Sequence, residues 1–469
     1  MSKRKAVINS LAFVVPRFGK DLGGGAETLV RQIVLALKNR RDFVDIYAQQ
    51  NGESPDRLQA VKNLEVWTTC ARDHRTWLNE LPAGKSEEEG ISVWRFPVDE
   101  RDTDTFIHFE LAMREGKVLS TDEQLDWLEN SVNSKALYRH IAERGSSFDA
   151  IVFAPYLFAT SFWGALIYPE RSFVIPCLHD EHYAYQSVFK YLFSSVRGLI
   201  FNSSAERDLA QELYNFGDDE KPRMAVVGMG FDVHRERGSL KDERTHCRKA
   251  VQEKFGNRGL ATTYLLYVGR KEEGKNLHLL IKAFSEFRAR HPRASLQLAI
   301  VGSGDIAFLD SLPEGVIDLG FVSEAEKSLL LQGALALCQP SVNESFSIVV
   351  MESWLAGTPV VVHANCSVTR NHVLSSGGGL YFADENEFVA VVEALLNSDE
   401  LGSVLGISGY DYVCKNYSWE AVMSRLYGAL EGFKVIDVTS QSEAKYLNDD
   451  SKQSAPITAR GKAANRGAF

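Results

Sequence analysis

Short runs of apolar residues, bounded by glycine or proline, alternate along the chain with stretches of helical periodicity. This alternation is typical of a parallel β-sheet that helices cover on both faces. In the first half the expected strands span residues 6–15, 44–48, 92–96, 150–154, 173–176, 198–202 and 223–227. In the second half they span 263–268, 296–301, 316–319, 335–339 and 358–363. The pattern therefore predicts two doubly wound α/β units in tandem.

Residues 229–258 mix charged side chains with little strand character, which indicates a crossing between the two units. We expect a Rossmann-like N-terminal domain over 1–228, a linker over 229–258 and a Rossmann-like C-terminal domain over 259–415. An amphipathic helix should follow over 416–433. The remainder, 434–469, is polar and poor in bulky apolar residues, so it is expected to be disordered.

The composition agrees with this division into two folded domains. A chain of 469 residues exceeds the size at which one hydrophobic core usually stops growing. Its net charge of −10 argues against a general attraction to nucleic acid, whose binding proteins need basic surface. The six cysteines form no CxxC pair and no zinc-like cluster, which favours a reducing, cytoplasmic setting.

One uncharged stretch, residues 150–169, is nearly long enough to cross a bilayer. Pro155 and Gly164 interrupt it, and its start is rich in β-branched and aromatic residues. A strand that ends at the proline, followed by a short buried helix, is therefore the better interpretation.

The most informative segment runs from Asn343 to His363 and follows a predicted strand. Glu344 falls in the loop beyond that strand, a helix begins near Phe346, and Gly357 ends it. Ligands of open α/β sheets bind beyond the carboxyl ends of the strands, where the N–H groups of a helix N-terminus favour a pyrophosphate. Glu352, one turn into the helix, could accept hydrogen bonds from ribose hydroxyls, whereas either glutamate alone could equally serve as a surface cap or ion-pair partner.

A second segment follows the first strand of the second unit and places Gly269, Arg270 and Lys275 in its terminal loop. A guanidinium and an ammonium could stabilise the charge that develops on a departing nucleoside diphosphate, in place of a divalent metal. We identify no Asp-x-Asp triplet of the kind that holds a metal between substrate phosphates, so no metal is expected. A solvated charged turn is the alternative.

The first unit offers two comparable features. The glycines of Gly23–Glu27, among them Gly24 and Gly25, follow the first strand and open a helix, so backbone could approach a phosphate there. His179 directly follows another predicted strand, in the segment His179-Asp180-Glu181-His182. A flexible turn and a core histidine are the respective alternatives. The stretch from Thr68 to Asn79 could form an acceptor surface or simply pack.

Together these residues resemble the retaining glycosyltransferases of family 4 (group 1), which have the GT-B fold of two facing Rossmann-like domains. The E-x7-E pair with Gly357-Thr-Pro359 carries most of the resemblance. Gly269, Arg270 and Lys275 match the family's phosphate-binding pair, and the opening glycines and the His-Asp segment at His179 are also similar.

The resemblance implies a role for each residue. Glu344 would contact the donor sugar and Glu352 the ribose of a UDP- or GDP-sugar. His179 would face the donor sugar, where a neutral imidazole could hydrogen-bond a hydroxyl. The backbone of Phe346, Ser347 and Ile348 would bind the phosphates, although Ser347 stands where the family often has glycine. It further implies metal-independent transfer with retention to a glycan or lipid-linked acceptor in polysaccharide or cell-envelope synthesis, with peripheral contact at the inner face of a membrane.

Three other functions compete with this interpretation. Residues 302–307 match the dinucleotide fingerprint G-x-G-x-x-G/A, so an NAD-dependent oxidoreductase is one rival, although the fingerprint belongs on the first βα turn of its sheet. A glycosidase would use the paired carboxylates but would leave Arg270 and Lys275 without a task. A nucleotide-sugar-binding protein without turnover is the third.

Overall fold

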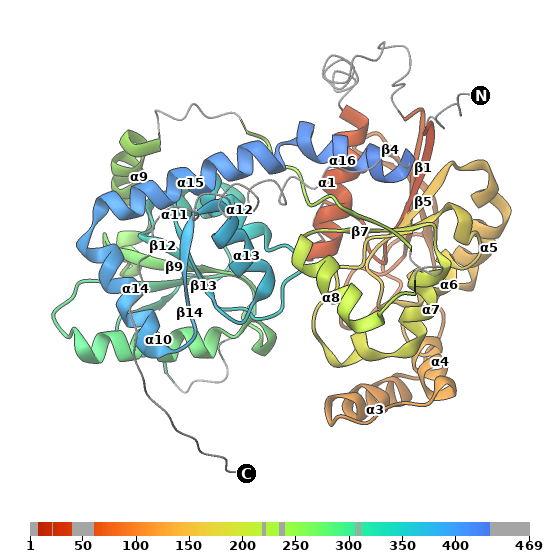
Figure 1. Cartoon of the computed structure of the whole chain (residues 1–469), viewed down its shortest axis with the longest axis horizontal. Coiled ribbons are helices and arrows are strands. Elements are labelled where there is room, and N and C mark those ends of the chain that lie inside the picture. The colour runs from red at the N-terminus through yellow and green to blue at the C-terminus, as the bar shows by residue number, and fades with distance from the viewer. Residues whose placement is uncertain are drawn as a thin grey trace, which may run out of the picture. The chain divides into compact units, whose positions relative to one another are not determined.

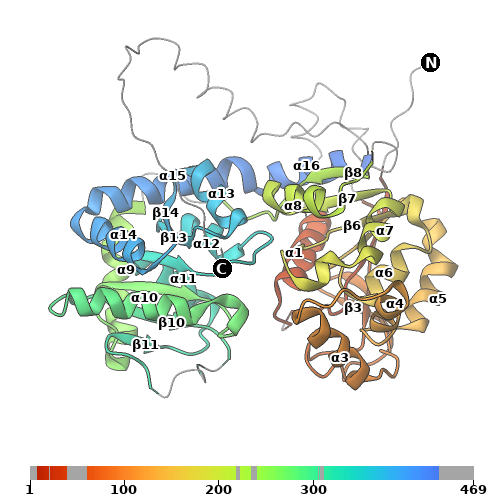
Figure 2. The same ribbon diagram turned by 60° about the horizontal axis from the view of Figure 1, so that its bottom comes forward.

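The computed structural model describes residues 8–20, 22–39, 61–217, 222–233, 240–304, 306 and 311–431. The strand expected at 44–48 and the tail expected at 434–469 lie outside the described residues. The described part contains two sheets, and Figures 1 and 2 show helices on both faces of each. The prediction of two parallel-sheet, Rossmann-like α/β domains is confirmed.

The first sheet has the strand order β3-β4-β2-β1-β5-β6-β7-β8. Its strands are parallel except β3, which forms an antiparallel hairpin with β4. The strands are β1 (Ser10–Val14), β2 (Asn63–Thr69), β3 (Gly84–Glu88), β4 (Ile91–Phe96), β5 (Ala150–Phe153), β6 (Ser172–Val174), β7 (Gly198–Phe201) and β8 (Arg223–Val226). The helices of this domain are α1 (Gly25–Asn39), α3 (Thr103–Arg114), α4 (Thr121–Glu129), α5 (Lys135–Arg144), α6 (Ala159–Ala165), α7 (Ser187–Ser195) and α8 (Ser204–Tyr214).

Strand β1 shows why helices cover both faces of this sheet. Leu11 and Phe13 pack with the apolar side of α1, whereas Ala12 and Val14 face the cluster formed by α3 to α7. Successive side chains of a strand point to opposite faces, so an unbroken apolar run buries both faces.

Two strands of the first sheet were not predicted. Strand β2 carries Glu65, whose charge interrupts the apolar pattern; in the fold Glu65 is buried and pairs with Arg144 at 2.8 Å. Strand β3 has the sequence GKSEE and is an exposed edge strand, so no hydrophobic alternation marks it.

The uncharged stretch of residues 150–169 forms strand β5 and the seven-residue helix α6, as expected. No helix within the described ranges is long and apolar enough to cross a membrane.

The second sheet is entirely parallel, in the order β11-β10-β9-β12-β13-β14. Renumbered from its first strand this is 3-2-1-4-5-6, the doubly wound order that reverses between β9 and β12. Its strands are β9 (Tyr264–Val268), β10 (Gln297–Val301), β11 (Val316–Asp318), β12 (Ala336–Gln339), β13 (Val360–His363) and β14 (Gly379–Phe382). The short edge strand β14 was not predicted.

The helices around this sheet are α9 (Leu240–Phe255), α10 (Leu277–Arg290), α11 (Glu324–Gly333), α12 (Ile348–Leu355), α13 (Ser367–Ser376), α14 (Glu385–Asn397), α15 (Asp399–Tyr417) and α16 (Trp419–Glu431). Leu265 and Tyr267 of β9 pack with α10 and α14, whereas Tyr264 and Leu266 share a core with α11 and α12. Helix α9 lies within the expected linker and packs against α11. Helix α16 covers most of the expected C-terminal helix and packs against β8 of the first sheet (Figure 2).

Candidate functional site

The site residues of the second domain lie at the carboxyl end of its sheet, where the strand order reverses. Strands β9 and β12 are neighbours, and the chain leaves them toward opposite sides of the sheet. A crevice opens at such a switch point because the two following helices diverge. The loop after β9 carries Gly269, Arg270 and Lys275, and the loop after β12 carries Glu344.

These two loops are joined by direct contacts. The Nζ of Lys275 lies 2.8 Å from Oε1 of Glu344, and both side chains are largely buried. Asn276, which follows Lys275 in a left-handed conformation, donates from its side-chain amide to the carbonyl of Pro340 at 3.1 Å. The structure therefore brings together one predicted phosphate ligand and the predicted sugar ligand.

Helix α12 begins directly after this loop. Its N-cap, Ser347, has φ 67° and ψ 76°, and its hydroxyl makes no capping hydrogen bond. Instead the Ser347 Oγ accepts from Nε2 of Gln339 at 3.4 Å. The first N–H groups of α12 consequently have no side-chain cap, which is the arrangement that favours an anion at a helix N-terminus. Phe346 is buried against His372 and Tyr417, so only its backbone is placed to contact a ligand.

Arg270 points elsewhere in this structure. Its guanidinium is half exposed and pairs with Glu272 of its own loop at 3.0 Å. The preceding residue, Gly269, donates its N–H to the carbonyl of Val301. The carbonyl of Gly269 lies so close to Gly302 that a side chain at position 302 would clash with it. The neighbouring Lys271, which sequence reasoning missed, is buried and pairs with Asp318 at 2.7 Å.

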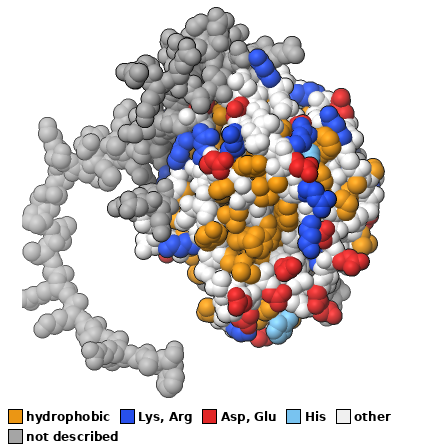
Figure 3. All heavy atoms as spheres, turned by 90° about the vertical axis from the view of Figure 1, so that its right-hand side faces the viewer, with side chains coloured by type: hydrophobic (Ala, Val, Ile, Leu, Met, Phe, Trp, Pro, Cys, Tyr) orange, Lys and Arg blue, Asp and Glu red, His pale blue; other side chains and the backbone are white. Residues whose placement is uncertain are grey.

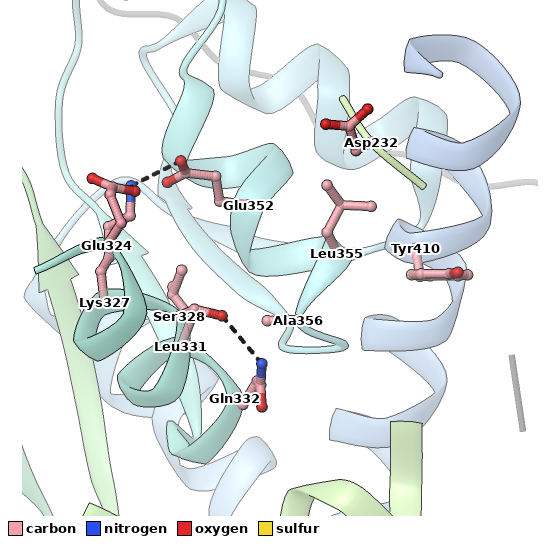
Figure 4. Close-up of a pocket in the computed structure, with 10 residues that line it drawn as sticks. All are labelled: Asp232, Glu324, Lys327, Ser328, Leu331, Gln332, Glu352, Leu355, Ala356 and Tyr410. Carbon is pink, nitrogen blue, oxygen red and sulfur yellow. Dashed lines mark hydrogen bonds and ion pairs between the residues drawn. The ribbon is translucent and has the colours of Figure 1, made fainter. Parts of the chain in front are cut away.

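Glu352 lines a pocket of about 330 Å³ between α11 and α12. Figure 4 shows its carboxylate turned toward Lys327 of α11, whose Nζ lies 2.8 Å from Oε1 of Glu352 and 2.7 Å from Glu324. Burial raises the pKa of Glu352, and the ammonium of Lys327 partly offsets this effect. Ser323 and Glu326 form a capping box that fixes the start of α11 one turn before Lys327.

His179 of the first domain belongs to a small hydrogen-bonded cluster. Its Nδ1 lies 2.7 Å from Oε1 of Glu181, and the other oxygen of Glu181 accepts from the hydroxyl of Tyr183. The N–H of Leu178 donates to the buried carboxylate of Glu206 at 2.7 Å, which anchors the segment to α8. A carboxylate at Nδ1 fixes the ring orientation and leaves Nε2 for another partner.

Gly24 and Gly25, which follow β1, have different surroundings. A side-chain carbon at Gly24 would lie 2.0 Å from Oε2 of Glu27, whereas one at Gly25 would meet no described atom within 4 Å. Glu27 forms a buried ion pair with Arg17 at 2.5 Å. Gly24 therefore makes room for this pair, and Gly25 faces open space.

An Asp-x-Asp triplet does occur in the chain, contrary to the sequence interpretation. It is formed by Asp102, Thr103 and Asp104, and Asp102 is the N-cap of α3, where its carboxylate accepts from the N–H groups of Asp104 and Thr105. Within the ranges given above, no group of three or more His, Cys, Asp or Glu side chains is placed to hold a metal ion.

Three charged residues near the predicted ones were missed, namely Lys327, Lys271 and Glu181. Lys327 and Lys271 act on partners far away in sequence, so no local spacing marks them. Glu181 stands two residues after His179, and that spacing was the only available signal.

Residues 262–398 match the family model described as Glycosyl transferases group 1. The chain is 25% identical over 282 residues to an alpha-monoglucosyldiacylglycerol synthase of Streptococcus pneumoniae, covering 54% of this chain and 60% of the relative. It is 31% identical over 180 residues to a phosphatidyl-myo-inositol mannosyltransferase of Mycobacterium leprae, covering 36% and 46%. The matches thus span about half the length of these relatives.

Among solved structures, the chain resembles a sucrose-phosphate synthase of Thermosynechococcus elongatus, with TM-score 0.60, 17% identity and coverage of 90% and 99%. It also resembles the Anabaena protein HepE in complex with UDP, with TM-score 0.59, 16% identity and coverage of 90% and 100%. At these identities the likeness concerns the fold. The chain is thus similar to the glycosyl transferases group 1 over residues 262–398, and it has the GT-B fold of these structural neighbours.

Proposed function

We propose that the protein is a retaining glycosyltransferase that moves a sugar from a UDP- or GDP-sugar to a glycan or lipid-linked acceptor without a metal ion. The observation that carries this proposal is the pair of Lys275 and Glu344 beside the uncapped start of α12. A cation, a hydroxyl-binding carboxylate and free backbone N–H groups at one switch point suit a diphosphate linked to a sugar.

The reaction follows from the charges. The bond between the anomeric carbon and the β-phosphate oxygen breaks, and the leaving diphosphate gains negative charge. Lys275 and the N–H groups of Ser347 and Ile348 stabilise that charge more in the transition state than in the donor. Arg270 joins them once it exchanges Glu272 for a phosphate. The acceptor oxygen bonds to the anomeric carbon on the leaving-group face, and its proton passes to the departing phosphate.

The other predicted residues position the donor. Glu344 accepts hydrogen bonds from hydroxyls of the transferred sugar, and Glu352 accepts them from the ribose. His179 presents Nε2 to a sugar hydroxyl, since Glu181 occupies Nδ1. Gly24 and Gly25 allow backbone to approach the donor in the first domain.

An apolar or lipid-linked acceptor has partial support. One relative above is named as a synthase of monoglucosyldiacylglycerol and the other as a phosphatidyl-myo-inositol mannosyltransferase, so both names contain a lipid. Figure 3 shows hydrophobic side chains gathered on one face of the first domain, bordered by charged residues. Exposed apolar residues of that domain include Leu78, Ile107, Leu111, Val118, Tyr185 and Tyr191. Peripheral contact with a membrane, and a role in envelope glycan synthesis, are part of this proposal.

Two alternatives differ from it in measurable ways. For an NAD-dependent oxidoreductase the fingerprint should follow β9, whereas Gly302 and Gly304 follow β10, and Ala307 lies outside the described residues. A binding protein without turnover would keep the donor site but form no product.

The test is incubation of the full chain with UDP- and GDP-sugars in EDTA, with acceptor extracts, while release of nucleoside diphosphate is measured. We expect release with one donor, and its loss in Lys275→Met. Lys282→Met, an exposed lysine on α10, is the matched control and should retain turnover. Donor binding without release would favour the binding protein, whereas NAD binding without donor binding would favour the oxidoreductase.

A further inference from the structure

The first domain contains a second pocket, of about 320 Å³, that the donor does not explain. One wall is the loop after β1, and the opposite wall is the β3–β4 hairpin. Arg72 closes it from the segment after β2, so the pocket lies beside the carboxyl ends of β1 and β2. The apolar part of its lining is Phe18, Leu22 and Leu81, and the charged part is Lys20, Arg72, Glu88, Glu89 and Arg95.

The acidic groups of this pocket are already neutralised. The buried guanidinium of Arg95 pairs with Glu88, and it also donates to the carbonyl of Phe18 at 2.9 Å. Glu89 pairs with Arg31 of α1. Neither carboxylate therefore needs a cation from a ligand, and the buried Nε of Arg95 has no hydrogen-bond partner among the described residues.

The two remaining cations are uncommitted. Lys20 and Arg72 are exposed, and neither side chain forms an ion pair or hydrogen bond with any residue that the structure describes. The backbone beneath Arg72 is nevertheless fixed, because its carbonyl accepts from Nη1 of Arg17 at 3.0 Å. Arg17 is itself held by the buried pair with Glu27. The backbone that carries Arg72 is therefore held in place, and the Lys20 and Arg72 side chains are available to an anion.

We propose that this pocket binds the acceptor, and that the acceptor end is an acidic saccharide carrying a carboxylate or a phosphate monoester. Lys20 and Arg72 contact the acid group, with Arg72 able to bind it in a bidentate manner. Phe18, Leu22 and Leu81 pack against the apolar face of the sugar ring. The volume lies at the low end of ligand pockets, which suits one sugar unit. This inference rests on the proposed function, of which it names the acceptor class.

The test measures binding of three probes to the full chain by calorimetry: glucuronate, glucose 6-phosphate and neutral glucose. We expect millimolar or tighter binding of at least one acidic sugar, weaker binding at high salt, and none of glucose. The tighter of the two acidic probes identifies carboxylate or phosphate as the group that is recognised.

Substitutions localise the binding. Lys20→Ala and Arg72→Ala should each weaken it about tenfold, as expected for loss of one charge-assisted hydrogen bond. Lys190→Ala on α7, an exposed lysine outside the pocket, should leave it unchanged. Equal binding of glucose, absence of binding by both acidic sugars, or insensitivity to both substitutions overturns the proposal.

UDP and GDP binding, measured in parallel with Lys275→Met, separates this inference from the proposed function. Absence of UDP and GDP binding in the unmodified chain, together with intact acidic-sugar binding, counts against the transferase and leaves the pocket assignment standing. Nucleotide binding without acidic-sugar binding counts against the pocket alone.

Discussion

The ammonium of Lys327 lies 2.8 Å from the carboxylate of Glu352, and the two residues come from the neighbouring helices α11 and α12. Burial raises the pKa of Glu352, and this ammonium opposes that rise and so favours the ionised carboxylate. Only the ionised form offers both oxygens as acceptors to a ribose. Lys327 thus acts through Glu352 as a positioning residue.

Replacing Lys327 with methionine should therefore weaken donor binding about tenfold, since a partly buried charged hydrogen bond contributes about 1.5 kcal/mol. The pKa of Glu352 rises further without the ammonium, so the loss should grow as the pH falls from 8 to 6. Titration of UDP or GDP into both proteins across this range measures the effect. Lys327→Arg should restore most of the affinity, and Lys254→Met, which removes an exposed partner of Glu326, should not change it. Equal affinity in Lys327→Met at every pH contradicts the assignment.

The sequence predicted the second domain better than the first for a physical reason. Strands β9, β10, β12 and β13 are almost entirely buried and have plain apolar sequences. By contrast, β2 carries a buried charge that only the fold pairs, and β3 is an exposed polar edge strand. Lys275 and Glu344 could be named because they follow such runs directly. Lys327 could not, because its distance from Glu352 depends on how α11 and α12 pack.

Ser347 holds a left-handed backbone conformation, with φ 67°, at the start of α12. A side chain in this conformation costs about 1 kcal/mol that glycine avoids. The free energy of unfolding of Ser347→Gly should therefore be about 1 kcal/mol higher than that of Ser347→Ala. Both variants lose the hydroxyl, but only glycine relieves the backbone strain. Urea unfolding of both proteins measures the difference, and equal midpoints with equal slopes would contradict it.

Glu181 fixes the ring of His179 through Nδ1. Glu181→Gln keeps the shape of the side chain but removes the charge, so the imidazole loses its orienting anion. We expect kcat to fall about tenfold while KM for the donor changes by less than about twofold. Steady-state kinetics with saturating acceptor separates the two constants. Tyr185→Phe removes an exposed hydroxyl that contacts Asp180 in the same segment, and it serves as the control. A rise of KM alone would assign Glu181 to donor binding instead.

Two buried histidines should make the protein sensitive to acid. Burial lowers the pKa of His372 to about 3, and burial with the nearby charge of Arg144 lowers that of His140 to about 4. The unfolded chain therefore binds more protons than the folded one below the ordinary pKa of 6.5. Stability is fully present above about pH 6.5 and is lost as the pH falls toward 4.

The Tm is measured at pH 7 and at pH 5, and we expect it to be several degrees lower at pH 5. The ring of His140 lies 4.8 to 5.0 Å from those of Trp67, Trp94 and Phe96, so phenylalanine fits this aromatic cluster. His140→Phe should reduce the drop, whereas His108→Phe, at an exposed position on α3, should not. The same drop in all three proteins would show that other groups control the acid response.

Gly24 and Gly25 form a matched pair for testing why the loop after β1 is rich in glycine. Alanine at Gly24 would collide with Glu27 and disturb its buried pair with Arg17, so Gly24→Ala should lower Tm. Alanine at Gly25 meets no atom of the residues that the structure describes, so Gly25→Ala should keep the wild-type Tm. If a ligand approaches the backbone there, Gly25→Ala should still weaken binding of the intact donor, because the added methyl group occupies the space that the ligand needs. Wild-type donor affinity in Gly25→Ala would remove this glycine from the donor site.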